Sequence, residues 1–274
     1  MRTVRARFQK PEGFRTGRFC RLRAGARVIT EDTKVETEGG HVPLVFAKGQ
    51  VPAGLCAEVY PALRKVATRS NSRAQAAGPL NARTLAKVRR RRNLVQINSH
   101  AYVNHDKKKF KTPGGYRYAN SVQSGTVGWL SDKTMSKFTS DHFEGHYQQA
   151  LRLAARVDAR FARLMPGRHR GMARALEGRP KMSRAFTTMA CNYNFRTALH
   201  KDNKTMPGSV LVFTLLGDDR AQGGLLTFPQ LNVAVDLRVG DLLAFDAALL
   251  HCNTPFRNRA FHRLSCVFYN SSRG

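Results

Sequence analysis

Leu199-His200-Lys201-Asp202-Asn203 is the stretch from which the fold of this chain can be worked out. It follows residues 186–199, where apolar and polar side chains alternate as is typical of a strand. In an extended segment, residues two apart point to the same face, so the His200 imidazole and the Asp202 carboxylate are expected to converge. A second histidine, His251, ends the apolar run 242–250. Two imidazoles and one carboxylate are a set of metal ligands, and we predict a metal site at His200, Asp202 and His251.

An arginine follows these residues at the start of another strand-like run, 264–269. Arg263 can hold a dicarboxylate through its two-pronged guanidinium, with Ser265 assisting. Arg257 and Arg259 compete with it for this role. The metal ligands alone would also suit zinc, but the arginine favours Fe(II) with a dicarboxylate cosubstrate. The order His-x-Asp, His, Arg-x-Ser, with strand patterns between, is far more specific than any one of these residues.

Four segments in the last third of the chain carry a further pattern: His200-Lys201-Asp202-Asn203, Gly223-Gly224-Leu225-Leu226-Thr227-Phe228, Val239-Gly240-Asp241-Leu242-Leu243-Ala244-Phe245 and His262-Arg263-Leu264-Ser265-Cys266-Val267-Phe268-Tyr269. Together they resemble the TET/JBP family of 2-oxoglutarate/Fe(II)-dependent nucleic-acid base dioxygenases. The resemblance implies that His200, Asp202 and His251 bind Fe(II), and that Arg263 and Ser265 bind 2-oxoglutarate. His200, Asp202, His251 and Arg263 are then the expected catalytic residues. An algal member of the family uses ascorbate, which is the alternative cosubstrate.

The pattern of elements predicts an α+β chain with a mainly β core. From about residue 185, short strands alternate with glycine and aspartate turns, which is typical of a jelly roll, the double-stranded β-helix of dioxygenases. Apolar residues spaced three and four apart predict a long buttressing helix over 141–165, ended by a proline, and a short helix over 172–177. We expect a basic, partly disordered N-terminal arm over 1–40 with one short strand at 26–30. The dioxygenase domain is expected over 41–274, with its β-helix core at about 185–274.

The charge balance points to a polyanionic partner. The chain has 47 Lys and Arg residues against 18 Asp and Glu, a net charge of +29. So much like charge destabilises a folded chain unless a polyanion offsets it, and nucleic acid is a better candidate than a membrane surface. Two basic clusters and one asparagine are candidate nucleic-acid contacts: Arg89, Arg90, Arg91, Arg92, Lys107, Lys108, Lys109 and Asn203. The alternative for the clusters is an ordinary solvated surface.

The resemblance and the charge together predict oxidation of a pyrimidine methyl group in double-stranded DNA, with the base flipped out of the duplex. We expect 5-methylcytosine to be converted to 5-hydroxymethylcytosine, with further oxidation open. The alternatives are a thymine hydroxylase of the JBP type and a prolyl-type protein side-chain hydroxylase, which would leave the charge unexplained. Thr205 stands where relatives that oxidise 5-methylcytosine often carry a second carboxylate, so the base is not decided by the sequence.

The cysteines indicate the compartment. There are five, and no two are spaced as Cys-x-x-Cys, so neither a disulfide framework nor a structural zinc site is expected. This pattern favours a reducing environment, and with DNA as partner we expect the nucleus or another DNA-containing compartment. We expect a monomer that does not bind membranes, since no apolar run approaches the length of a membrane span.

Overall fold

The computed structural model describes residues 1–10, 13–90, 94–97, 100–103, 116–202, 209–216, 222–257 and 262–271. Its strands are β1 (Arg2–Arg5), β2 (Arg27–Ile29), β3 (Thr33–Glu36), β4 (Leu44–Ala47), β5 (Arg69–Ser70), β6 (Leu94–Ile97), β7 (His100–Val103), β8 (Tyr116–Ala119), β9 (Val122–Ser131), β10 (Thr134–Met135), β11 (Thr188–Tyr193), β12 (Ser209–Leu216), β13 (Leu226–Phe228), β14 (Val233–Val235), β15 (Leu242–Asp246), β16 (Cys252–Asn253) and β17 (Leu264–Tyr269). Its helices are α1 (Ala53–Val66), α2 (Ala82–Arg89), α3 (Lys137–Asp141), α4 (His146–Leu164) and α5 (Pro166–Ala175), with 3-10 turns η2 (Glu38–Gly40) and η3 (Pro229–Leu231).

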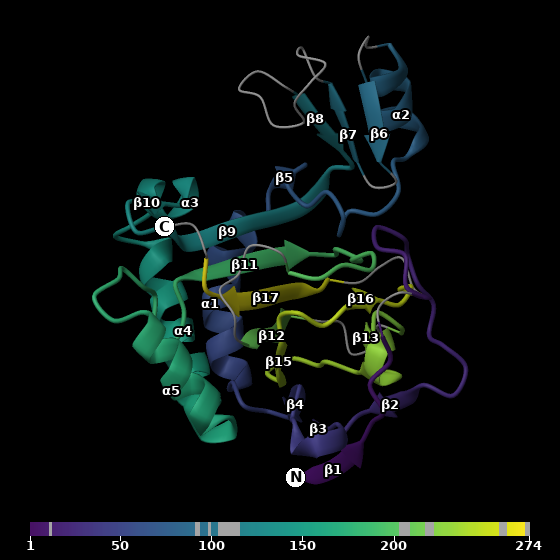
Figure 1. The fold of residues 1–274 in the computed structure, drawn as a ribbon. Helices are drawn as coiled ribbons and strands as arrows, with labels where there is room; N and C mark the ends of the chain where they lie inside the picture. The colour runs from purple at the N-terminus through teal and green to yellow at the C-terminus, as the bar shows by residue number, and fades with distance from the viewer. Residues whose placement is uncertain are drawn as a thin grey trace.

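Two sheets form the body of the described chain. The larger has ten strands in the order β1-β3-β4-β15-β12-β17-β11-β9-β10, with β5 paired to β9, and the smaller has four in the order β16-β13-β14-β2. The helices α1, α4 and α5 lie on one side of the larger sheet (Figure 1). This arrangement confirms the predicted α+β class with a mainly β core, and the short strands expected after residue 185 are present as β11 to β17.

Strand β15 is apolar on both faces because both of its faces are covered. Leu242 and Ala244 belong to the core that includes α1 and α4, whereas Leu243 and Phe245 belong to a second core shared with the smaller sheet. All four are fully buried. The candidate ligand His251 lies on the second side, with its ring centroid 5.0 Å from that of Phe245. The metal ligands are therefore expected to lie between the two sheets.

Helix α4 buttresses the larger sheet, as predicted. Its buried residues are Tyr147, Ala150, Leu153, Ala154, Val157, Asp158 and Phe161. The Phe161 ring lies 5.6 Å from that of Phe186, which in turn lies 5.6 Å from Phe268 of β17. This aromatic row ties the helix to the strand that follows Arg263.

The bounds of this helix differ from the prediction at both ends. Ser136 accepts a hydrogen bond from the Thr139 N–H and so caps the separate short helix α3. Gly145 has non-helical backbone angles (φ −114°, ψ −93°), so α4 begins at His146 rather than 141. Pro166 is not the residue that ends α4, because it is the first residue of α5, whose first turn tolerates the missing N–H. The short helix predicted at 172–177 overlaps the C-terminal end of α5.

Residues 1–40 do not form a separate arm where the structure describes them, which corrects the prediction. The strand expected at 26–30 is β2, and it pairs in parallel with β14 of the smaller sheet. Two strands were not predicted: β3 pairs with β4 in the larger sheet, and β1 pairs in parallel with β3. Val4, Ile29 and Val35 are buried in the core between the sheets, and this burial outweighs the polar composition around them.

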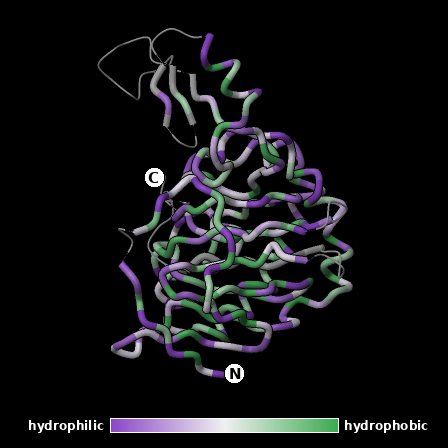
Figure 2. The backbone as a smooth tube through the Cα atoms, turned by 90° about the vertical axis from the view of Figure 1, so that its right-hand side faces the viewer, coloured by the Kyte–Doolittle hydropathy of each residue, from purple (hydrophilic) through white to green (hydrophobic). Residues whose placement is uncertain are grey.

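A third sheet, β6-β7-β8, stands apart from the two-sheet body beside α2, and it was not predicted. Figure 2, turned by 90° from Figure 1, also shows it projecting from one end of the body, in which hydrophobic and hydrophilic stretches alternate. The long strand β9 leads from it back into the body. Within the described ranges, every helix is too short or too polar to cross a bilayer.

Candidate metal centre and substrate pocket

The two candidate histidines are held together by their backbones. His200 and His251 form an isolated antiparallel bridge, with the His200 N–H donating to His251 O (3.1 Å) and the His251 N–H to His200 O (2.9 Å). His251 directly precedes β16, which pairs with β13 in the smaller sheet. The ring centroids lie 4.3 Å apart. The sequence places these residues 51 positions apart, and the bridge brings their side chains to one face.

The same nitrogen of both rings is directed at the candidate metal position. Each Nδ1 lies within hydrogen-bond distance of a backbone carbonyl, His200 of Ala198 O (2.8 Å) and His251 of Leu249 O (3.0 Å). A carbonyl can only accept, so Nδ1 carries the proton and Nε2 keeps its lone pair. Burial lowers the pKa of His200 to about 4, and the neighbouring His251 adds to the lowering. Both effects keep the His200 imidazole neutral at pH 7, the form that binds a metal.

Asp202 completes the set. Its two carboxylate oxygens lie 3.9 Å from His200 Nε2 and 3.9 Å from His251 Nε2. One ligand atom from each of the three residues lies within 4.8 Å of the others. Two imidazoles and a carboxylate fit Fe(II) and leave coordination positions open for other ligands. The structure therefore brings together the three predicted residues in an arrangement that fits the ion.

A pocket of about 1090 Å³ opens beside these three residues. Arg263 and Ser265 both line it, as does Tyr269 at the other end of β17. Two hydrogen bonds join the Arg263 backbone to Asn194. The Arg263 N–H donates to Asn194 Oδ1 (2.8 Å), and the Arg263 carbonyl accepts from the Asn194 N–H (2.9 Å). Asn194 adopts a left-handed conformation (φ 46°) to make this contact. Burial lowers the pKa of Arg263 to about 10, so the guanidinium is still charged at pH 7.

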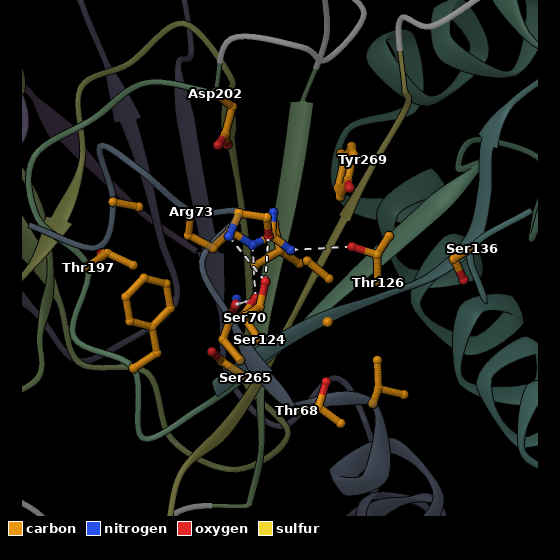
Figure 3. Close-up of a pocket in the computed structure, with 18 of the residues that line it drawn as sticks. Thr68, Ser70, Arg73, Ser124, Thr126, Ser136, Thr197, Asp202, Ser265 and Tyr269 are labelled. Carbon is orange, nitrogen blue, oxygen red and sulfur yellow. Dashed lines mark hydrogen bonds between the residues drawn. The ribbon is translucent and has the colours of Figure 1, made fainter. Parts of the chain in front are cut away.

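Sequence reasoning missed a second arginine in this pocket, Arg73. It lies between Asp202 and Ser124 in Figure 3, with Tyr269 and Thr126 nearby. Its Nε donates to Ser124 Oγ (2.9 Å) and its Nη2 to Thr126 Oγ1 (3.4 Å). Residues 68–81 are rich in Ser, Ala and Asn and show no apolar period, a pattern typical of a loop. No local signal in the sequence indicates that they return to the metal ligands.

The predicted nucleic-acid contacts are only partly described. Arg89 is the last residue of α2 and Arg90 follows it, and both are exposed and outside the pocket. Six others lie outside the residues whose side chains the structure describes: Arg91, Arg92, Lys107, Lys108, Lys109 and Asn203. Of the two arginines that competed with Arg263, Arg257 is exposed and Arg259 lies outside the described residues.

Comparisons with known proteins agree with this geometry. The Tet_JBP family model, described as the oxygenase domain of the 2OGFeDO superfamily, matches residues 134–272, about half of the chain. The bifunctional helicase and thymine dioxygenase JBP2 of Trypanosoma brucei brucei is 24% identical over 251 residues, which are 88% of this chain and 20% of that protein. The thymine dioxygenase JBP1 of the same species is 35% identical over 88 residues, 31% of this chain and 10% of that protein.

The chain thus spans about a fifth of the length of the JBP2 protein that it matches. Among solved structures, NgTET1 in complex with 5mC DNA has a TM-score of 0.53 at 14% identity, over 90% of this chain and 83% of that one. This likeness shows a shared fold.

Proposed function

The chain belongs to the TET/JBP family of 2-oxoglutarate/Fe(II)-dependent oxygenases, and from this we propose that it hydroxylates the 5-methyl group of a pyrimidine base in double-stranded DNA. One observation carries the proposal: His200, Asp202 and His251 converge at the wall of a pocket that Arg263 also lines. Ligand pockets are roughly 300–1,000 Å³. A volume of about 1090 Å³ therefore leaves room for a small dicarboxylate and a nucleobase together.

Each residue of the site has a role that its chemistry supports. His200 and His251 would hold Fe(II) through Nε2, and Asp202 through its carboxylate. Arg263 would pair with the distal carboxylate of 2-oxoglutarate, with Ser265 beside it, because a guanidinium matches a carboxylate with two parallel hydrogen bonds. This preference favours 2-oxoglutarate over ascorbate. When bound, the iron and the cosubstrate supply the oxidising chemistry, while the chain orients the methyl group and keeps the pocket dry.

The positive charge of the chain supports DNA as the partner. A net charge of +29 suits a polyanion, and the exposed Arg89 and Arg90 are suited to phosphate contacts. A methyl group inside a duplex cannot reach a pocket of this kind, so the base would have to leave the stack. Action on DNA places the protein in a DNA-containing compartment such as the nucleus. We keep the expectation of a monomer, in which one chain supplies the three metal ligands.

Two bases are candidates for the substrate. Our prediction from the sequence put 5-methylcytosine first, and the fold shared with NgTET1, which was solved with 5mC DNA, is consistent with it. The JBP relatives, described as thymine dioxygenases, support thymine equally well. Both bases present the same 5-methyl group, so the choice depends on the groups that face the rest of the ring.

The experiment is nucleoside mass spectrometry after incubating the protein with Fe(II), 2-oxoglutarate and DNA that contains both bases. We expect a 5-hydroxymethyl pyrimidine from the wild-type protein and none from the Asp202→Ala variant, with the fold of that variant checked by circular dichroism. Hydroxylated peptides without any base product would instead indicate the prolyl-type side-chain hydroxylase. Base oxidation that persists in the Asp202→Ala variant would exclude the proposed metal site.

A further inference from the structure

Arg73 is fixed in the pocket more firmly than a loop arginine needs to be. The hydroxyls that hold it belong to Ser124 and Thr126, two residues apart on one face of β9. Ser124 Oγ in turn donates to Asn192 Oδ1 (2.7 Å) on the neighbouring strand β11. A guanidinium has five N–H donors, and these two hydroxyls together with the nearby Tyr269 hydroxyl use only part of them. The network therefore orients the group while leaving donors directed toward the pocket.

The charge of Arg73 is not neutralised by these contacts. Both partners are neutral hydroxyls, and in the part of the chain that the structure describes no carboxylate lies within ion-pair distance of it. A half-buried cation without a carboxylate is costly unless a ligand supplies an acceptor. Ordinary structural arginines of this chain differ, since Arg179, for example, pairs with Asp132 at 2.7 Å. Arg73 is thus suited to a ligand that accepts hydrogen bonds.

Arg73 also lies close to the metal ligands and to the aromatic wall. It lines the same pocket as His200 and Asp202. Burial raises the pKa of Tyr269, and the same guanidinium partly offsets that rise. Figure 3 shows Arg73 in the same part of the pocket as Asp202 and Tyr269. A base held against that wall with its methyl group toward the metal has two ring carbons beside the methyl carbon, C4 and C6, and in one of its two orientations the C4 substituent faces Arg73.

The two candidate bases differ at this substituent. Thymine carries O4, which accepts hydrogen bonds, whereas cytosine carries N4 with two donor hydrogens. Arginine can only donate. In that orientation a C4 carbonyl would accept from Arg73, whereas an amino group there would leave donors facing one another in a desolvated site. Within the described lining of the pocket, the carboxylates are Asp202, assigned to the metal, and Asp141, which pairs with Lys137 at 2.7 Å.

We propose that Arg73 is a specificity-determining residue that donates to the C4 carbonyl of the target base, so that thymine is preferred over 5-methylcytosine. The inference rests on the proposed function, because it assigns the substrate of the same pocket. Ser124 and Thr126 are positioning residues, since they act on the base only through the guanidinium.

The test compares two duplexes of one sequence, whose target base is either thymine or 5-methylcytosine. The readout is kcat/KM for the hydroxymethyl product, measured by mass spectrometry. The wild-type protein should favour thymine by at least about tenfold, the usual effect of one hydrogen bond to a charged group. Arg73→Gln can both donate and accept, so its activity on thymine should fall by about tenfold and its preference should approach one. Arg69→Gln, a nearby exposed position in the pocket lining, should keep the wild-type ratio.

Two further measurements separate base reading from other roles of Arg73. The KM for 2-oxoglutarate, from succinate released without DNA, should change less than about twofold in Arg73→Gln; a much larger rise would assign Arg73 to the cosubstrate and overturn the proposal. In the metal-free protein, a single-stranded thymine oligonucleotide should bind more tightly than its 5-methylcytosine counterpart, and Arg73→Gln should abolish the difference. Should Arg73→Gln not fold, Ser124→Ala answers the same question, since it loosens the guanidinium and should reduce the preference.

The outcomes test the role of Arg73 separately from the proposed function. A wild-type protein that oxidises 5-methylcytosine as fast as thymine, or an Arg73→Gln variant with an unchanged ratio, overturns the role of Arg73 while the proposed function stands. A wild-type protein that releases succinate but oxidises neither base overturns the proposed function itself.

Discussion

Asn253 is expected to control metal affinity although it is not a candidate ligand. It lies two residues after His251, and its Oδ1 accepts from both Thr197 Oγ1 (2.8 Å) and the Thr197 N–H (3.3 Å), three residues before His200. Its Nδ2 donates to Gly224 O (3.1 Å). The side chain thus joins the two ligand-bearing segments to the loop before β13. Asn253→Ala removes these three contacts from a site that is only 4% exposed.

The size of the effect follows from the contacts. Three hydrogen bonds at about 1 kcal/mol each predict a loss of about 3 kcal/mol, or a fall in Tm of about 6–12 °C. Groups that orient metal ligands without touching the metal typically contribute roughly 10- to 100-fold to affinity. Isothermal titration with Fe(II) under anaerobic conditions should show a loss of that order, beside a lowered Tm by calorimetry.

Asn120→Ala is the matched control. Its side chain is 8% exposed and bonds to backbone groups of residues 77–81 rather than to the ligand-bearing segments. It should lower the Tm by a similar amount and leave metal affinity within about twofold of the wild type, since the ligand geometry is untouched. If Asn253→Ala loses stability as Asn120→Ala does but binds Fe(II) like the wild type, the link between this side chain and the metal site is refuted.

Three further predictions follow from other contacts. An added Cβ at Gly125 would lie 1.9 Å from a backbone carbonyl oxygen of α1, so Gly125→Ala should lower the free energy of unfolding in urea by about 3 kcal/mol or more. An added Cβ at Gly145 meets no atom within 4 Å, so Gly145→Ala should be near neutral. Equal stabilities of the two variants would contradict this reasoning. In the metal-free protein the pKa of His200 is about 4 when the chain is folded and near 6.5 when it is unfolded, so the unfolded chain takes the proton first. The contribution of His200 to stability should be complete above pH 6.5 and be lost as the pH falls to about 4. His200→Asn should remove this pH dependence, and an unaltered pH profile in the variant would disprove the reasoning. Arg263→Gln should raise the KM for 2-oxoglutarate about tenfold or more in a succinate assay, and the exposed Arg257→Gln should not; turnover supported by ascorbate alone would exclude this role.

The part of the fold that the sequence predicts is the part with a strong local pattern. The burial of one face of α4, and of the strands after residue 185, requires apolar residues at regular spacings. These spacings can be read directly from the sequence. His200 and Asp202 could be paired because strand geometry relates residues two apart. His251 and Arg263 could be added because an ordered set of metal and carboxylate ligands is chemically specific.

Features that depend on tertiary contacts were not visible in the sequence. Arg73 is placed by hydroxyls 51 and 53 residues further along the chain, and nothing near it distinguishes it from other loop arginines. Strands β1 and β3 are short and carry charged residues, so only their pairing and the burial of Val4 and Val35 identify them. Helix bounds were wrong where one residue, Gly145, leaves the helical region. For Arg73, β1 and β3 the determining partner is distant in the sequence.

The strands of residues 1–40 have a practical consequence for anyone shortening this protein. Removing that segment would expose the long side of β4 and that of β14, whose residues are otherwise buried apolar side chains. An unpaired, flat, hydrophobic strand edge is a template for association with another chain. A version that starts near residue 41 would retain every candidate ligand and still be prone to aggregate, because β1, β2 and β3 serve to close the two sheets against further pairing.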